Sequence, residues 1–444
     1  MDCRRTSYRH NSHWYIVSAR LRKYTIVAGN SLTIPSFFKN RYRDHKNIIK
    51  IVSASIIAVF FTVYTASAFS SGAKLFATLF SDSASGDENY NRVYVIGLIV
   101  AAVVILVYTF MGGFKAVCTT DLIQGLMMIV AILTVPVLAY AILTFDTSFS
   151  SALAAKGVEQ PAQFLNFFVN GDGTPVSAVS IISNLAWGLG YFGMPHILVR
   201  FMAVKSNEEI KKSRKIAVVW VIISLTASCL IGLIARGYLT AQLDDATSES
   251  VFIRTIQQLF SGNGVLIFIG GIFLCGILAA IMSTADSQLL VTASAVSEDL
   301  YKGAVKKNAS EKSSLLVGKI AVAVVAVIAF FIALNPKSSI MGLVSDAWAG
   351  FGSAFGPVVL LALFWKRSTL SGAISGMATG ALTVIIWDYI PLVNGQTLYA
   401  ATNLYSLVVG FGLALIVNVI VSLLSKKPSK EITDEFDSIK NIEV

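Results

Sequence analysis

The chain has 444 residues, of which 55% are hydrophobic and only 14% are charged, against roughly a quarter charged in an ordinary soluble domain. With a mean hydropathy of +0.70, this composition argues against a water-soluble globule and predicts a polytopic α-helical membrane protein. The formal net charge of +10 could suggest a nucleic-acid partner, but the lysines and arginines lie between apolar runs and form no single stripe, so no nucleic-acid binding is predicted.

The chain begins with a polar segment. Residues 1–47 are predicted to form a basic cytoplasmic leader, because they contain no apolar stretch typical of a signal peptide. Residues 48–425 are predicted to form a ten-helix transmembrane domain, and residues 426–444 a cytoplasmic tail. The ten apolar segments are residues 48–80, 93–113, 117–145, 178–203, 216–236, 263–297, 315–335, 339–365, 369–390 and 402–425.

These segments should all be helical. Hydrocarbon offers no hydrogen-bond partner to backbone N–H and C=O groups, and the runs lack the alternation of a barrel strand. The fold class is therefore predicted to be all-α. Lysines and arginines gather in alternate connections, and the opposite connections are acidic or neutral. By the positive-inside rule this pattern predicts a multi-pass protein of the cell (plasma) membrane with both termini in the cytoplasm.

Signatures of enzymes are weak in this sequence. There is no phosphate-binding G-x-x-x-x-G-K-[ST] motif. A G-x-G-x-x-G pattern at Gly188, Gly190 and Gly193 lies inside an apolar segment and lacks the preceding strand that a dinucleotide site requires. The four histidines build no convincing metal centre. The sequence therefore predicts a protein that is not an enzyme and has no catalytic residues.

The fourth apolar segment contains helix breakers. Three glycines and Pro195 within eight residues should interrupt the helix and free backbone groups inside the membrane. Trp187 and Tyr191 are four residues apart, so both rings fall on one helical face. Two interpretations stay open: a wall for a small ligand, or a kink filled with packing aromatics.

The sixth segment carries a stripe of oxygens. Ala280, Ser283, Thr284 and Ser287 follow helical spacing along one face, and hydroxyl and carbonyl oxygens suit a weakly held cation such as Na⁺. Ser and Thr within membrane helices also commonly bond the carbonyl four residues earlier, which is the competing interpretation. Asp286 lies in the same helix beside this stripe, and a carboxylate inside a membrane segment indicates function.

Other charged residues within or near the segments have simpler explanations. Asp121 begins a segment, where a carboxylate can cap the helix. Asp346 lies about two turns into its segment, which favours a position facing a cavity. Arg200 and Lys74 lie near segment ends, where long side chains reach the membrane surface.

These residues resemble the sodium:solute symporter family, and within it the branch that transports proline. The stretches that carry the resemblance are residues 20–38, 108–117, 187–203, 277–302 and 346–360. The resemblance implies a LeuT-type fold of two inverted five-helix repeats, with Na⁺ and a small solute bound near the membrane midplane.

The resemblance also assigns roles by position. It implies that Ala280, through its carbonyl, and Ser283 and Thr284, through their hydroxyls, bind Na⁺. Trp187, Tyr191 and Pro195 match the broken helix that lines the solute side. Asp121 matches an acidic position linked to Na⁺ coupling, and Asp286 is expected to contribute to coupling as well. The expected function is Na⁺-driven uptake of proline or a related small solute, with the bilayer as surroundings.

The sequence also departs from the family pattern. Family members are expected to have thirteen spans, and this chain matches them from near the end of the third, while residues 1–13 match nothing in the family. One alternative is therefore a truncated fragment or scaffold that inserts into the membrane but does not support coupled transport. Met194 and Asp346 differ from the residues expected in proline transporters, so a symporter of another small solute is the other alternative.

Overall fold

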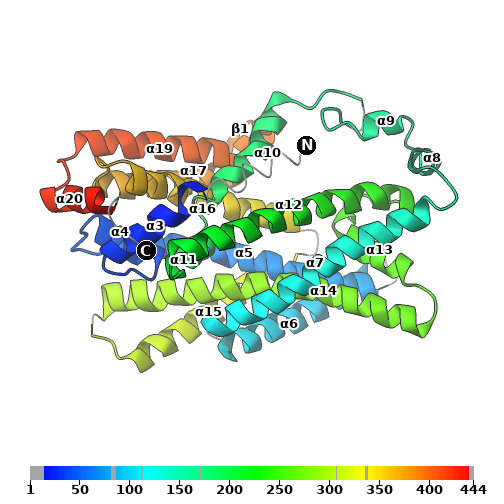
Figure 1. The fold of residues 1–444 in the computed structure, drawn as a ribbon, viewed down its shortest axis with the longest axis horizontal. Coiled ribbons are helices and arrows are strands. Elements are labelled where there is room, and N and C mark those ends of the chain that lie inside the picture. The colour runs from blue at the N-terminus through cyan, green and yellow to red at the C-terminus, as the bar shows by residue number, and fades with distance from the viewer. Residues whose placement is uncertain are drawn as a thin grey trace.

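The computed structural model describes residues 15–81, 87–111, 114–170, 173–245, 247–306, 308–335 and 339–439. Within these ranges the fold is helical except for one short hairpin, formed by the antiparallel strands β1 (Pro391–Val393) and β2 (Gln396–Thr397). The expectation of an all-α fold is confirmed. The long helices run roughly side by side, so the molecule is a bundle with two distinct ends (Figure 1).

Nine helices of the described ranges are long and apolar enough to cross a membrane. They are α5 (Ile48–Phe80), α6 (Glu88–Met111), α7 (Phe114–Leu143), α12 (Asn207–Tyr238), α14 (Gly264–Ser294), α15 (Glu311–Ala333), α16 (Ile340–Phe364), α17 (Leu370–Tyr389) and α19 (Ser406–Leu424). The remaining predicted segment is the fourth, residues 178–203, and it forms two consecutive short helices, α10 (Ala178–Gly190) and α11 (Pro195–Ala203). The interruption lies within the run of glycines and proline.

Shorter elements connect the long helices or cap the bundle. They are α3 (Ser18–Val27), α4 (Ile34–Arg41), α8 (Phe149–Ala155), α9 (Pro161–Phe164), the 3-10 helix η1 (Ser248–Ser250), α13 (Val251–Leu259), the π-helix η2 (Ala295–Val305), α18 (Leu398–Thr402) and α20 (Lys430–Ser438). Because η2 follows α14 without a break, the helix that carries the oxygen stripe changes its winding where it reaches the end of the bundle.

The long helices form two groups that share α5. Helices α16, α17 and α19 pack on one another, and α16 and α19 also pack on α10, whereas α6, α7, α12, α14 and α15 form the second group (Figure 1). Helix α5 contacts α16 on one side and α6, α14 and α15 on the other. The surface between α11 and α14 lies between these groups, and it holds the site described below.

Glycines on α17 allow its neighbours to pack closely against it. Gly372 and Gly380 lie on α17, where a Cβ atom would come within 2.0 Å of the Ser422 hydroxyl and 2.2 Å of the Ser353 carbonyl oxygen, respectively. Only glycine allows α19 and α16 to approach α17 so closely.

Helices α3 and α20, which lie outside the transmembrane region, are packed against the bundle. Leu21 and Tyr24 of α3 are fully buried in the main apolar core, so residues expected to form a leader stabilise the fold. Helix α20 of the tail inserts Phe436 against the guanidinium groups of Arg20 and Arg41, at 5.1 and 5.3 Å from the ring centroid. These cation–π contacts anchor the tail to one end of the molecule.

Candidate functional site

The site is organised by the break between α10 and α11. Helix α16 passes so close to this break that a Cβ atom on Gly190 would lie 2.0 Å from Trp348 Nε1, and one on Gly193 would lie 2.3 Å from the Phe351 carbonyl oxygen. The chain therefore needs glycine at both positions. Pro195 then begins α11 as its first residue, where a missing N–H costs nothing.

The predicted aromatic residues lie beside this break and face α16. The ring of Trp187 stacks on Trp348 at 5.5 Å between centroids, and on Tyr405 at 6.0 Å. Tyr191 meets Trp348 edge-on at 4.8 Å. One backbone carbonyl at the end of α10 has a partner, because Trp348 Nε1 donates to Trp187 O at 3.0 Å. Trp348 and Tyr405, which the sequence analysis did not single out, thus complete an aromatic cluster of four rings.

The oxygen stripe on α14 converges on one atom. Ser283 Oγ donates to Ala280 O at 3.2 Å, and Thr284 Oγ1 donates to the same oxygen at 3.0 Å. Three oxygens therefore lie together, as a small cation site requires. This geometry is also the ordinary back-bonding of membrane hydroxyls. For a cation to reach the Ala280 carbonyl, both hydroxyls would have to turn their hydrogens away.

Asp121 does not cap its helix. Helix α7 begins at Phe114, so Asp121 lies about two turns inside it, and the prediction of a helix cap is wrong. Its Oδ2 accepts a hydrogen bond from Arg200 Nη2 at 2.6 Å, and the same nitrogen donates to Ser287 Oγ at 2.8 Å. Arg200 was expected to extend to the membrane surface, and this expectation is wrong. Its side chain instead joins α11 to α7 and α14.

Asp286 is buried on the neighbouring face of α14. It is fully inaccessible to solvent, and its Oδ1 accepts a hydrogen bond from Thr109 Oγ1 of α6 at 2.9 Å. Its Oδ2 has no hydrogen-bond partner among the described residues, and neither does Oδ1 of Asp121. Buried carboxylate oxygens without donors are costly, so these two atoms mark a place that favours a cation.

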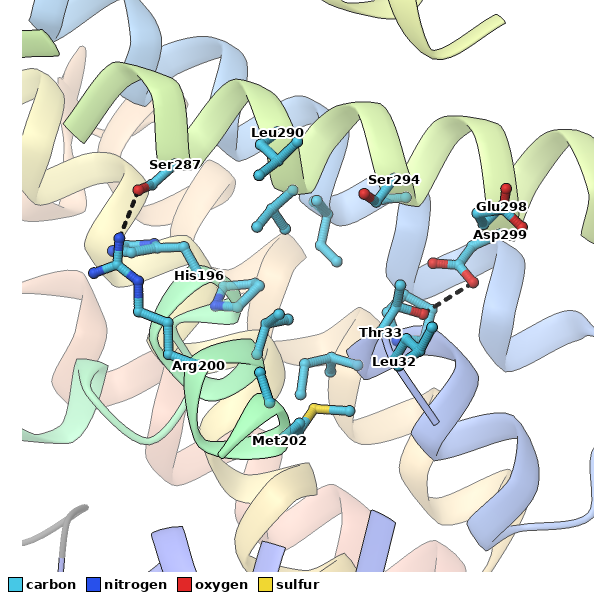
Figure 2. Close-up of a pocket in the computed structure, with 18 of the residues that line it drawn as sticks. Leu32, Thr33, His196, Arg200, Met202, Ser287, Leu290, Ser294, Glu298 and Asp299 are labelled. Atoms are coloured by element: carbon cyan, nitrogen blue, oxygen red, sulfur yellow. Dashed lines mark hydrogen bonds between the residues drawn. The ribbon is translucent and has the colours of Figure 1, made fainter. Parts of the chain in front are cut away.

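A cavity of about 390 Å³ opens between α11, α14 and the start of α4. Figure 2 shows Arg200 and Ser287 at one end of it, Leu290 and Ser294 along α14, and Asp299 at the other end. Pro195 lines this cavity, but Trp187 and Tyr191 are not among its lining residues. The face of α14 that carries Ser283 and Ser287 continues by helical spacing into Ser294, so the cavity follows the oxygen stripe toward the end of the bundle.

The far end of the cavity was not predicted from the sequence. Asp299 of η2 is fully buried, forms an ion pair with Lys50 of α5 at 3.0 Å, and accepts hydrogen bonds from Thr33 at 3.1 Å and Ser36 at 2.9 Å. These partners join α4 and α5 to η2. Asp299 lies just beyond the predicted segment 263–297, next to Glu298 and close to Lys302, so no signal in the sequence distinguished it from an exposed charge.

The family follows from comparison with known proteins. The model of the sodium:solute symporter family matches residues 11–380. The chain belongs to this family. Its members are Na⁺-coupled transporters and not enzymes. Na⁺ is therefore the co-transported ion, and a small solute is transported with it. With nine apolar helices of spanning length among the described residues, this symporter is a multi-pass membrane protein.

Two curated relatives are similar over almost the whole chain. It is 42% identical to sodium/proline symporter 2 of Staphylococcus saprophyticus over 97% of this chain and 80% of the relative. It is 41% identical to the sodium/proline symporter of Staphylococcus aureus over the same shares. A solved Na⁺-coupled sialic acid symporter in a substrate-bound, outward-open state superposes with a TM-score of 0.69 at 18% identity, covering 96% of this chain and 83% of that one. The LeuT-type fold expected from the sequence is thus confirmed.

Proposed function

We propose that this symporter uses Na⁺ moving down its gradient to drive uptake of proline or a closely related small solute. The observation that carries the proposal is the oxygen stripe of α14, which runs past the broken helix into a cavity lined by both helices. The similarity to sodium/proline symporters supports proline as the solute.

In this proposal Na⁺ binds at Ala280, Ser283 and Thr284. Neutral oxygens compensate for lost water without the charge that would trap the ion, so binding stays reversible. Asp121 and Asp286 take part in coupling Na⁺ binding to transport. Each presents a buried carboxylate oxygen without a hydrogen-bond donor among the described residues. The aligned hydroxyls toward Ser294 then provide steps along which the ion leaves.

The solute would bind beside Trp187, Tyr191 and Pro195. An apolar pyrrolidine ring packs well against aromatic faces, and the break between α10 and α11 leaves backbone groups near it for the carboxylate and amine. Because Trp348 contacts both predicted rings, movement of α16 would open or close this place.

We also propose how the chain lies in the cell membrane. Residues 48–425 form the transporter domain within the lipid bilayer, and both termini are cytoplasmic. The end of the bundle that carries α4 and α20 holds Arg20, Arg41, Arg43 and Lys366, whereas Asp244, Asp245 and Glu249 lie in the connection between α12 and α13. This asymmetry supports the orientation. Basic residues serve topology in this proposal, and no nucleic acid is a partner.

Equilibrium binding of labelled proline to the purified protein tests the proposed solute. We expect saturable binding in Na⁺ that is lost when K⁺ replaces Na⁺, and displacement by unlabelled proline before other small amino acids. Displacement by another solute first would favour a symporter of that solute. Na⁺-dependent binding without uptake into vesicles would favour the transport-inactive alternative, and no binding in Na⁺ would contradict the proposal.

A further inference from the structure

One nitrogen atom of Arg200 bonds to oxygens on two other helices. Nη2 lies 2.6 Å from Asp121 Oδ2 on α7 and 2.8 Å from Ser287 Oγ on α14, while Arg200 itself belongs to α11. Figure 2 shows its guanidinium at the end of the cavity, directed at Ser287. A positive group therefore already occupies a position that offers oxygens to a cation.

The surroundings hold more negative than positive charge. Asp286, adjacent to Ser287 in sequence, is fully buried and is hydrogen-bonded through one oxygen only, by Thr109. Its second oxygen and Oδ1 of Asp121 lack partners among the described residues. The guanidinium of Arg200 is paired with Asp121 alone, so the Asp286 carboxylate has no cationic partner among the described residues, and the cluster retains the capacity to hold another cation.

We propose that Arg200 is a tethered competitor of the transported cation. Its guanidinium holds Asp121 and Ser287 while the ion is absent, and Na⁺ arriving at Asp121 and Asp286 displaces it into the cavity. This inference rests on the proposed function and adds to it, because it takes the coupling residues Asp121 and Asp286 as a place where Na⁺ binds in addition to Ala280, Ser283 and Thr284.

The geometry allows such an exchange. The Arg200 side chain is 46% exposed, and its long stem is flexible. The guanidinium can therefore move into the cavity and remain solvated there. Arg200 lies five residues after Pro195, in the last turn of the helix that follows the break. Its release removes the side-chain link from α11 to α7 and α14, and so connects ion binding to the helix that follows Trp187 and Tyr191. Arg200 is a positioning residue in this account.

A purely structural ion pair makes the opposite prediction. If Arg200 only held Asp121 in place, replacing it would disorder the carboxylate and weaken Na⁺ binding. If Arg200 competes, replacing it with a neutral side chain removes a rival charge and strengthens Na⁺ binding. The sign of the change separates the two.

The test measures binding of radioactive Na⁺ to the purified protein without proline. Arg200→Gln should lower the dissociation constant at least about fivefold, the lower end of typical coupling between sites. Arg200→Lys, which keeps the charge, and Arg236→Gln on α12, remote from the site, should stay near the parent value. Asp121→Asn should abolish the gain in the Arg200→Gln background. Equal or weaker binding by Arg200→Gln would overturn the inference while leaving the proposed function intact, and no saturable binding by any form would overturn both.

A second measurement needs no substitution at Arg200. Cys118 lines the same cavity, so its alkylation reports on a guanidinium released there. In a background in which Cys3, Cys229 and Cys275 are serine, Na⁺ should change the rate of Cys118 alkylation relative to K⁺, because displacement of Arg200 from Asp121 moves its charge relative to the thiol, and a nearby cation favours the reactive thiolate. An alkylation rate that is the same in both salts would overturn the inference even if Arg200→Gln did not fold.

Discussion

Ser283 and Thr284 share a single acceptor, the carbonyl oxygen of Ala280. Each hydroxyl donates its hydrogen inward, which leaves its lone pairs directed away from that carbonyl. A cation that approaches from the side of these lone pairs gains the two hydroxyl oxygens as ligands at once. It gains the Ala280 carbonyl oxygen as a third ligand when the hydroxyls rotate. The same three atoms thus satisfy one another without the ion, and in the proposed function they also bind it.

We predict that Ser283→Ala and Thr284→Ala each raise the Na⁺ concentration that gives half-maximal uptake. Loss of one polar partner costs on the order of 1 to 3 kcal/mol, which corresponds to about 5- to 150-fold in affinity. Ser228→Ala is the matched control, because that hydroxyl also bonds the carbonyl four residues earlier but is exposed on α12. Uptake measured across a Na⁺ series checks this, and unchanged half-maximal values for both variants would place the ion elsewhere.

Trp187 and Tyr191 should affect the solute more than the ion. Replacing either with Ala removes a ring from the cluster around Trp348, so we expect the proline concentration for half-maximal binding to rise about tenfold or more, the cost of a lost aromatic contact of ~1.5 kcal/mol or greater. Phe331→Ala, on the exposed face of α15, is the control. If Na⁺ and proline affinities fell equally, the break between α10 and α11 would simply have collapsed.

At the scale of elements, Glu249 of η1 joins three parts of the end opposite α20. Its carboxylate forms an ion pair with Lys74 of α5 at 2.6 Å and accepts hydrogen bonds from Ser339 Oγ at 3.0 Å and the Met341 N–H at 3.2 Å, at the start of α16. Burial alone would raise the pKa of Glu249, but Lys74 and the two hydrogen bonds outweigh it and hold the pKa below its ordinary value of 4.5. The charged form therefore stabilises the fold.

This shift sets a pH dependence. Because the pKa of Glu249 is lower in the folded protein, its contribution is complete above the ordinary value of 4.5 and is lost as pH falls through the lower folded pKa. Glu249→Gln should lower the thermal unfolding midpoint at neutral pH, by an amount equivalent to roughly 1 to 2 kcal/mol. The difference between parent and variant should disappear in acid below that pKa. A difference that is constant across the pH range would contradict this assignment.

Helix packing gives a second prediction at this scale. Gly380→Ala should destabilise the contact of α17 with α16 by about 1 to 3 kcal/mol, because its Cβ would meet the backbone oxygen of Ser353 at 2.2 Å. Gly412→Ala on α19 is the matched control, since nothing lies within 4 Å of its added Cβ. Thermal unfolding in detergent should show a lower midpoint for the first variant only, and equal midpoints would mean that α16 and α17 pack differently.

At the scale of the whole molecule, the sequence best predicts features that depend on residues close together in the chain. Apolar length sets the long helices, and the glycines with Pro195 set the break between α10 and α11, because these depend on neighbours in the chain. The pairing of Arg200 with Asp121 could not be predicted, because the residues are 79 positions apart in the chain and meet only in the folded bundle. For the same reason Trp348, Tyr405 and the Lys50–Asp299 pair were missed. The resemblance to a family supplied the roles that spacing alone left open.

Gradient-driven uptake tests the central claim most directly. The purified 444-residue protein is reconstituted in liposomes, and labelled proline is followed with an inward Na⁺ gradient, with equal Na⁺ on both sides, and with K⁺ in its place. We predict accumulation of proline above its outside concentration in the first condition only, and its collapse when the Na⁺ gradient is dissipated. Proline entry that never exceeds that of empty liposomes under the inward gradient would contradict the account.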